Sequence, residues 1–285
     1  MKVTLRAGRP DDAETCGQIC YRAFKTISDQ HNFPPDFPDA GAAVGLLTYI
    51  LSRSDIYSVV AEVDGRVVGS NFLWEYPMIA GIGPITIDPS VQNAAAGRSL
   101  MQDVLQRVRD RGFAGVRLVQ AAYHSRSLSL YTKLGFDTRE PLSLIQGQAI
   151  GLEIPSHPVR PASEADLEAC NELCLRVHGH DRGSELAGAI REGTATLVER
   201  AGRVTGYATV LGFFGHAVAE NNEDMKSLIS AARAFAGTGF LLPTRNGELM
   251  RWCLGNGLRV VQPMTLMSLG LYNEPAGAFL PSIVY

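Results

Sequence analysis

The chain lacks any apolar stretch of about 18 residues, the length that a membrane-spanning helix needs. It also lacks a block of basic residues, and its net charge of −3 argues against a nucleic-acid-binding protein. The first ten residues, MKVTLRAGRP, have no apolar core of a secretion signal. We therefore expect a cytoplasmic protein with neither a membrane nor a nucleic acid as a partner.

Cysteine is sparse, and the odd count of five is typical of reduced cytoplasmic thiols rather than of a disulfide framework. Cys16 and Cys20 are four residues apart, as are Cys170 and Cys174, so each pair lies on one helix face. Structural zinc sites use a different, knuckle-type spacing. We expect these side chains to be buried as small apolar groups, and we expect no metal site.

With 285 residues, 46% hydrophobic and 19% charged, the chain can bury a core and form one large or two ordinary domains. Its most informative segment follows the apolar run that ends at Ile87. Asp88–Pro89 stops that run, small residues follow, and residues 100–108 then show helical periodicity. The first N–H groups of a helix lack intrahelical partners, and the helix dipole is positive there. This order of strand, small-residue loop and helix predicts an anion site at residues 92–98.

Two motifs resemble those of one family. The spacing Gln92-x-x-Ala95-x-Gly97 is similar to the coenzyme A loop of the GNAT acyltransferases, Gln/Arg-x-x-Gly-x-Gly/Ala. Residues 127–136, SLSLYTKLGF, resemble the family's C-terminal signature, Leu-Tyr-x-Lys-x-Gly-Phe, and follow a predicted strand at residues 116–121. The chain departs from the family at Ala95. Alanine keeps the N–H of an anion cradle if φ is negative, but binding would weaken if φ must be positive.

The chain also contains an internal repeat. At an offset of 154 residues, Arg6 and Asp12 match Arg160 and Asp166, and the two cysteine pairs match each other. The segment DGRVVG at residues 64–69 is echoed by AGRVTG at residues 201–206. Together with the resemblance, this repeat predicts an α/β (α+β) fold of two tandem GNAT-like domains. Each domain should have a mixed, mostly antiparallel twisted sheet flanked by helices. We place them at residues 1–148 and 157–285, with a linker around residues 147–158.

The second copy differs where the first has its anion loop. After a predicted strand at residues 213–219 comes Glu220-Asn221-Asn222-Glu223-Asp224, whose three carboxylates would repel a diphosphate. We interpret residues 157–285 as a degenerate domain without the coenzyme A loop. Its expected roles are to cover the substrate cleft of the first domain or to form a homodimer.

The resemblance implies acetyl-CoA as the cofactor. Backbone N–H groups of Ile85 and Ile87 would hold the pantetheine arm and the acyl carbonyl, while Pro84 has no N–H to offer. His124 stands where the family often has Asn, and Ser127 is at a position that is usually small. The predicted cofactor-binding residues are Ile85, Thr86, Ile87, Gln92, Asn93, Ala94, Ala95, Ala96, Gly97, Arg98, His124, Ser127 and Tyr131.

Tyr131 occupies the position of the family's general acid, and its phenol would protonate the leaving sulfur. The alternative is an aromatic ring that only packs on the cofactor. For a general base, Glu75 is the nearest candidate at a strand end, although it is equally consistent with a surface residue. Asp88 more simply shapes the turn before Pro89. The family often uses ordered water in place of a direct base.

A proline-rich aromatic loop at residues 29–38 falls where the family's acceptor site is walled. It predicts His31, Phe33 and Phe37 as substrate-binding residues, and a plain linker is the alternative. The predicted activity is acetyl transfer from acetyl-CoA to a primary amine of a small molecule or peptide. The competing hypothesis is a non-catalytic acyl-CoA-binding regulatory or interaction protein.

Overall fold

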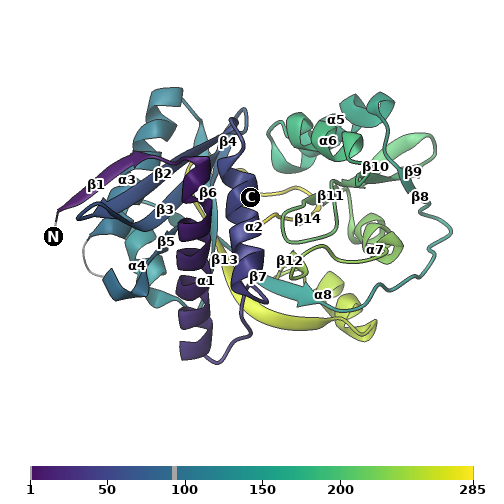
Figure 1. Ribbon diagram of the computed structural model, residues 1–285. Helices are drawn as coiled ribbons and strands as arrows, with labels where there is room; N and C mark the ends of the chain where they lie inside the picture. The colour runs from purple at the N-terminus through teal and green to yellow at the C-terminus, as the bar shows by residue number, and fades with distance from the viewer. Residues whose placement is uncertain (1, 92–94, 285) are drawn as a thin grey trace. The chain divides into compact units, whose positions relative to one another are not determined.

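The computed structural model describes residues 2–91 and 95–284, which divide into two compact units. Unit 1 contains residues 1–75, 79–118 and 123–135, and unit 2 contains residues 76–78, 119–122 and 136–285. Each unit has helices packed on a mostly antiparallel sheet (Figure 1), as the sequence predicts. Across the two described ranges, no helix has both the length and the apolar character needed to cross a membrane.

Unit 1 is built on a sheet in the order β1-β2-β3-β4-β6, with the short β5 paired to β3. Its strands are β1 (Val3–Ala7), β2 (Ile56–Val63), β3 (Arg66–Trp74), β4 (Ile79–Ile82), β5 (Thr86–Ile87) and β6 (Gly115–Ala121). Its helices are α1 (Ala13–Gln30), α2 (Ala40–Leu51), α3 (Ala96–Arg111) and α4 (Ser125–Lys133), with short 3-10 turns η1 (Pro10–Asp12) and η2 (Pro89–Val91).

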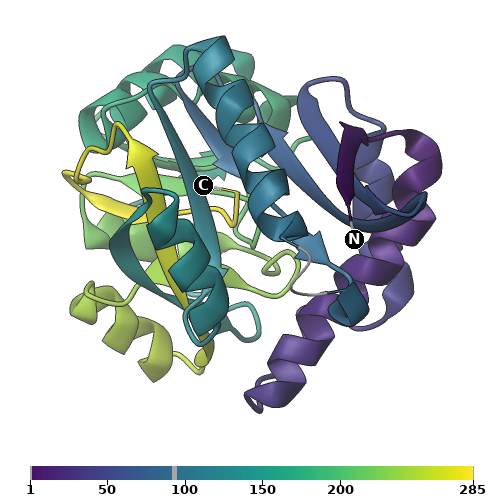
Figure 2. The same cartoon turned by 90° about the vertical axis from the view of Figure 1, so that its left-hand side faces the viewer.

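The helices of unit 1 cover both faces of this sheet (Figure 2). Neighbouring residues of a strand point to opposite faces, and β3 packs against both α1 and α3, with the amide of Asn71 bonded to the Leu100 carbonyl of α3. α1 and α2 pack closely because Gly17 has no side chain, since a Cβ there would lie 2.5 Å from Val44 Cα. The predicted apolar face of α3 is buried, as expected.

Unit 2 holds two further sets of strands. One has the order β13-β7-β12 and the other the order β14-β11-β10-β9-β8. The strands are β7 (Asp137–Gln146), β8 (Val159–Pro161), β9 (Thr196–Arg200), β10 (Arg203–Ala208), β11 (Ala217–Ala219), β12 (Phe240–Pro243), β13 (Arg259–Gly270) and β14 (Ala278–Leu280). The helices are α5 (Leu167–His178), α6 (Gly183–Arg191), α7 (Asn222–Ala231) and α8 (Gly247–Gly255), with a 3-10 turn η3 (Glu164–Asp166).

The compact units do not coincide with the two domains proposed from the sequence. β7 ends the first predicted domain, yet it groups with unit 2 because it pairs with β12 on one side and β13 on the other. The predicted strand at residues 213–219 is reduced to β11 at 217–219, because the chain turns tightly at Gly215, where a Cβ would lie 2.1 Å from the Val210 carbonyl oxygen.

The internal repeat reappears in the hydrogen bonds. Arg6 binds Asp12 at 2.7 Å and also Glu62 at 2.7 Å, while its counterpart Arg160 binds Asp166 at 2.7 Å and Glu199 at 2.9 Å. The β2–β3 and β9–β10 hairpins both turn through two residues with positive φ, at positions 64–65 and 201–202. All five cysteines are free and buried, as expected. The two halves are therefore structural copies of one another.

Candidate active site

The parallel strands β4 and β6 separate at a fork in unit 1. Their ladder ends at the pair Gly81–Arg117, after which β5 pairs with β3. The N–H of Asp88 donates to the Val68 carbonyl at 2.8 Å. Because alternate N–H groups of a strand face opposite edges, the N–H of Ile87 faces away from β3. The fork thus presents a main-chain donor at the edge from which β6 has separated.

The N-terminus of α3, at Ala96, comes five residues after the end of the 3-10 turn η2 (Pro89–Val91). Ala95 precedes the helix with φ of +60°, the left-handed region, and its carbonyl accepts the Ser99 N–H at 3.0 Å. The N–H groups of Ala96, Gly97 and Arg98 precede that first intrahelical bond, so the helix itself supplies no acceptor for them. Ala95 therefore has the positive φ that is unfavourable for alanine.

The described part of this anion site fits a diphosphate. At Gly97, a Cβ would meet its nearest neighbours, Ile87 Cγ1 and Leu130 Cδ2, at 3.7 and 3.9 Å, so a side chain there makes only ordinary van der Waals contacts. N–H donors and a positive dipole end are the donor set that phosphate oxygens need. The predicted residues Gln92, Asn93 and Ala94 lie outside the described residues.

Tyr131 lies on α4 and is buried, and this burial raises the pKa of its phenol. The hydroxyl consequently stays protonated at neutral pH and is able to donate a proton. His124 forms the N-cap of the same helix, and its carbonyl accepts the Ser127 hydroxyl at 2.9 Å. α4 thus carries three of the predicted site residues in two turns.

Both carboxylates considered as a general base, Glu75 and Asp88, already accept a hydrogen bond from an arginine. Glu75 accepts 2.6 and 3.2 Å hydrogen bonds from Arg107 of α3, and Arg111 lies 3.9 Å away. Asp88 accepts from the backbone N–H of Ser90 at 2.9 Å and from Arg22 at 2.9 Å. Burial raises the pKa of Asp88, but these hydrogen bonds outweigh it and lower the pKa overall. The turn-shaping interpretation of Asp88 is confirmed, while a basic role for Glu75 stays a prediction that requires the carboxylate to release Arg107.

The proline-rich loop between α1 and α2 packs against Tyr123, which follows β6 in the chain. The ring of Phe33 stacks on Tyr123 with centroids 4.1 Å apart, and the ring of His31 lies 5.2 Å from Tyr123. Phe37 instead makes an edge contact with Phe24 at 5.9 Å. The structure therefore brings two of the three predicted substrate residues to the residue that immediately precedes His124.

Tyr123 is the site residue that the sequence analysis missed. Burial raises the pKa of its phenol, Asp36 raises it further, and a hydrogen bond with Ser28 opposes them. Ser28 also donates to the Asp36 carboxylate at 3.3 Å. The one signal in the sequence that could have indicated it is an aromatic residue at a strand end, directly before the predicted cofactor residue His124.

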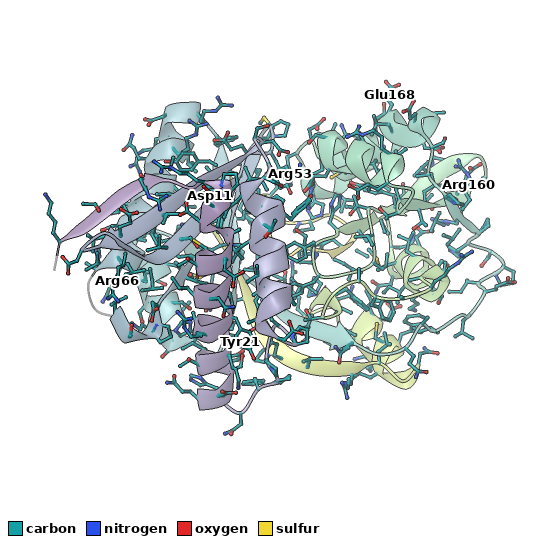
Figure 3. The ribbon with its side chains drawn as sticks, viewed as in Figure 1. Asp11, Tyr21, Arg53, Arg66, Arg160 and Glu168 are labelled. Atoms are coloured by element: carbon teal, nitrogen blue, oxygen red, sulfur yellow. The ribbon has the colours of Figure 1, made fainter. Side chains whose placement is uncertain are left out.

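A surface cavity of about 370 Å³ lies between α1 and the turn after β5. Its lining includes Tyr21 on α1, labelled in Figure 3. Charged groups of both signs contribute: Lys25 pairs with Asp29 at 2.6 Å, and Arg22 pairs with Asp88. The cavity thus offers a polar surface of mixed charge.

In unit 2, the helix start that corresponds to α3 is filled by the protein's own side chains. Asn221 caps α7 by accepting the N–H of Asp224 at 3.0 Å, and the buried Asp224 carboxylate binds Arg200 at 2.9 Å. Direct bonds also join α7 to the α8 region, with Lys226 binding Glu248 at 2.7 Å. The cap and the first two turns of α7 are thus tied to neighbouring side chains of unit 2.

Residues 22–136 match the Acetyltransferase (GNAT) family. A mycothiol acetyltransferase of Thermomonospora curvata is 36% identical over 78 residues, which are 27% of this chain and 26% of that protein. The match thus spans about a quarter of the length of this curated relative.

Solved structures share the fold over nearly the whole chain. A putative acetyltransferase from Pyrococcus horikoshii has a TM-score of 0.74 at 18% identity, covering 99% of this chain and 92% of that one. A tandem GNAT protein from the clavulanic acid biosynthesis pathway has a TM-score of 0.58 at 12% identity, covering 94% and 98%.

Proposed function

From the premise that residues 22–136 form a GNAT-family acetyltransferase domain within a tandem GNAT fold, we propose that this chain acetylates a primary amine. Acetyltransferases of this family use acetyl-CoA, which supplies the acetyl group as an activated thioester. The observation that carries the proposal is that unit 1 holds both a helix start whose first N–H groups, at Ala96–Arg98, have no acceptor within the helix and the buried phenol of Tyr131.

Each group has a defined task. The amides of Ala96, Gly97 and Arg98 would bind the diphosphate, and the Ile87 N–H would polarise the acyl carbonyl. Tyr131 would donate its proton to the departing sulfur. Pro84 offers no N–H, so this polarising role falls on Ile87 and, two residues earlier, Ile85.

We infer that the acceptor is a small polar amine. The cavity beside Asp88 has a mixed-charge lining and adjoins the α1 segment that leads to His31 and Phe33. A basic peptide would instead favour an open acidic cleft. The curated relatives are named for mycothiol, which agrees with a non-protein acceptor. We still expect a cytoplasmic location, which suits this chemistry. The buried free thiols agree with that expectation.

A panel of small amines, amino sugars and peptides, incubated with acetyl-CoA, tests the proposal. We expect thiol release that depends on the amine, and an acetylated product by mass spectrometry. Two observations favour the non-catalytic alternative: the positive φ of Ala95 and the ion pairing of Glu75. Binding of acetyl-CoA without thiol release across the whole panel would establish that alternative.

The second domain remains, in our proposal, a copy that no longer binds the cofactor. The start of α7 is capped by Asn221 and carries the carboxylates of Glu223 and Asp224 in its first turn, and these negative charges disfavour a diphosphate. We propose that it covers the acceptor cleft or mediates dimerisation. Measurement of the oligomeric state in solution separates these two roles.

A further inference from the structure

The reaction needs a group that removes a proton from the attacking nitrogen, and the carboxylates near the fork are already engaged. Glu75 is held by Arg107, and Asp88 by Arg22 and Ser90. Asp29 is held by Lys25 at 2.6 Å. A group outside these three ion pairs is therefore the better candidate for the base.

His124 lies in the chain between the proposed acid helix α4 and the residue that packs on the acceptor loop. It is the N-cap of α4, the helix that carries Tyr131 about two turns later. It also directly follows Tyr123, whose ring is packed on Phe33 and His31 of the acceptor loop. One residue therefore links the helix of the general acid to the wall of the acceptor site.

The surroundings of His124 keep its imidazole neutral. Burial lowers the pKa of His124, and His31 at the end of α1 and Arg126 of α4 lower it further. A neutral imidazole has one nitrogen lone pair that accepts a proton, whereas the Asn that the family often has at this position has no comparable basic nitrogen.

We propose that His124 is the general base, accepting the proton of the acceptor amine, rather than a contact to the pantetheine arm. This assignment rests on the proposed N-acetyltransferase activity. The amine nitrogen forms a bond to the acetyl carbon as the carbon–sulfur bond breaks. His124 takes one proton from the nitrogen, and Tyr131 gives one proton to the sulfur. The proton on His124 then returns to Tyr131 through solvent, so both side chains are regenerated.

The variant His124→Asn separates the two roles. Asparagine restores the family's polar group and is a favoured N-cap, so α4 should keep its start. We expect kcat to fall about 10²- to 10⁴-fold, the usual contribution of a general base. The Kd for coenzyme A should stay within about threefold, and the acid limb of the kcat/KM profile should disappear. A His124→Asn enzyme with wild-type kcat and pH profile overturns the proposal, as does a change confined to the coenzyme A Kd.

The variant Arg126→Gln tests the base role of His124 through the pH profile, which a purely structural role of His124 would leave unchanged. Removing this positive charge raises the pKa of His124, so the acid limb of kcat/KM should shift to higher pH with the plateau unchanged. An unshifted limb contradicts the assignment. Wild-type turnover is measured first: no thiol release with any amine rejects the proposed function itself, whereas turnover that survives His124→Asn rejects only the role of His124.

Discussion

The carboxylate of Glu75, at the end of β3, accepts a 2.6 Å hydrogen bond from Nε of Arg107 on α3. The same guanidinium lies 5.0 Å from the ring centroid of Tyr57, so it is held between an anion and an aromatic face. The pair therefore fastens α3 to the sheet from its solvent side. This arrangement argues for a structural role of the residue that the sequence suggested as a base.

We predict that Glu75→Gln leaves kcat within about threefold of the wild type. Its cost in the free energy of unfolding should stay below about 1 kcal/mol, because Arg107 is partly exposed and solvent screens the pair. Steady-state kinetics and urea unfolding measure the two quantities. A fall in kcat of about 100-fold, together with a lost acid limb, would restore Glu75 as the base.

The second prediction concerns Ala95. Its φ of +60° raises the free energy of an L-residue, whereas glycine adopts this conformation without strain. We expect Ala95→Gly to stabilise the protein by about 0.5–1 kcal/mol. It should also lower the Kd for coenzyme A, by up to about fivefold. Urea unfolding and calorimetry measure these changes.

The neighbouring substitution Ala96→Gly is the matched control for Ala95→Gly. Ala96 is the first residue of α3 and is buried, so the same exchange should destabilise the protein by about 1 kcal/mol. Equal effects at the two positions would mean that the left-handed conformation of Ala95 does not govern the loop.

Much of this fold could be predicted from the sequence, because the informative signals are local. Asp64–Gly65 predicted the hairpin, and Gly135, with φ of +96°, ends the segment of α4 as expected. The duplication could be recognised from Arg6 and Arg160. The φ of Ala95 and the partners of Glu75 could not be predicted, because they depend on how distant elements meet. Tyr123 was missed for the same reason, since its significance comes from a loop about 90 residues earlier.

Gly97→Glu tests where the cofactor binds. A carboxylate in the first turn stabilises a helix, and a Cβ at this position meets only ordinary contacts, so the variant should fold. The new charge would face the diphosphate, so we expect the coenzyme A Kd to rise about 100-fold or more. Calorimetry on the full chain gives both the Kd and the stoichiometry, which we expect to be one.

Gly247→Glu makes the same exchange at the first residue of α8 in unit 2, where Arg251 lies close to the new side chain. It should leave coenzyme A binding unchanged. If Gly247→Glu lost coenzyme A binding while Gly97→Glu still bound it, the cofactor would lie in the second copy. That result would refute the proposed site.

The last prediction concerns a buried histidine in unit 2. Tyr207 and His216 share a 3.0 Å hydrogen bond, and the Nδ1 atom of His216 lies 3.6 Å from Glu185. Burial lowers the pKa of His216 well below 6.5, and the nearby Arg182, His178 and His180 lower it further. The folded protein therefore holds His216 neutral at a pH where the unfolded chain has already taken up a proton.

Since the unfolded state binds the extra proton, the free energy of unfolding should fall as the pH drops below about 6.5, by about 1.4 kcal/mol per pH unit. Between about pH 6.5 and 5.5 ordinary carboxylates remain almost fully ionised, so the slope in this window comes chiefly from the histidines. His216→Gln, which retains a partner for Tyr207, should flatten the slope measured by urea unfolding. His157→Gln, on the linker, should keep it. If His216→Gln shows the wild-type slope, then the acid sensitivity of unit 2 comes from another group.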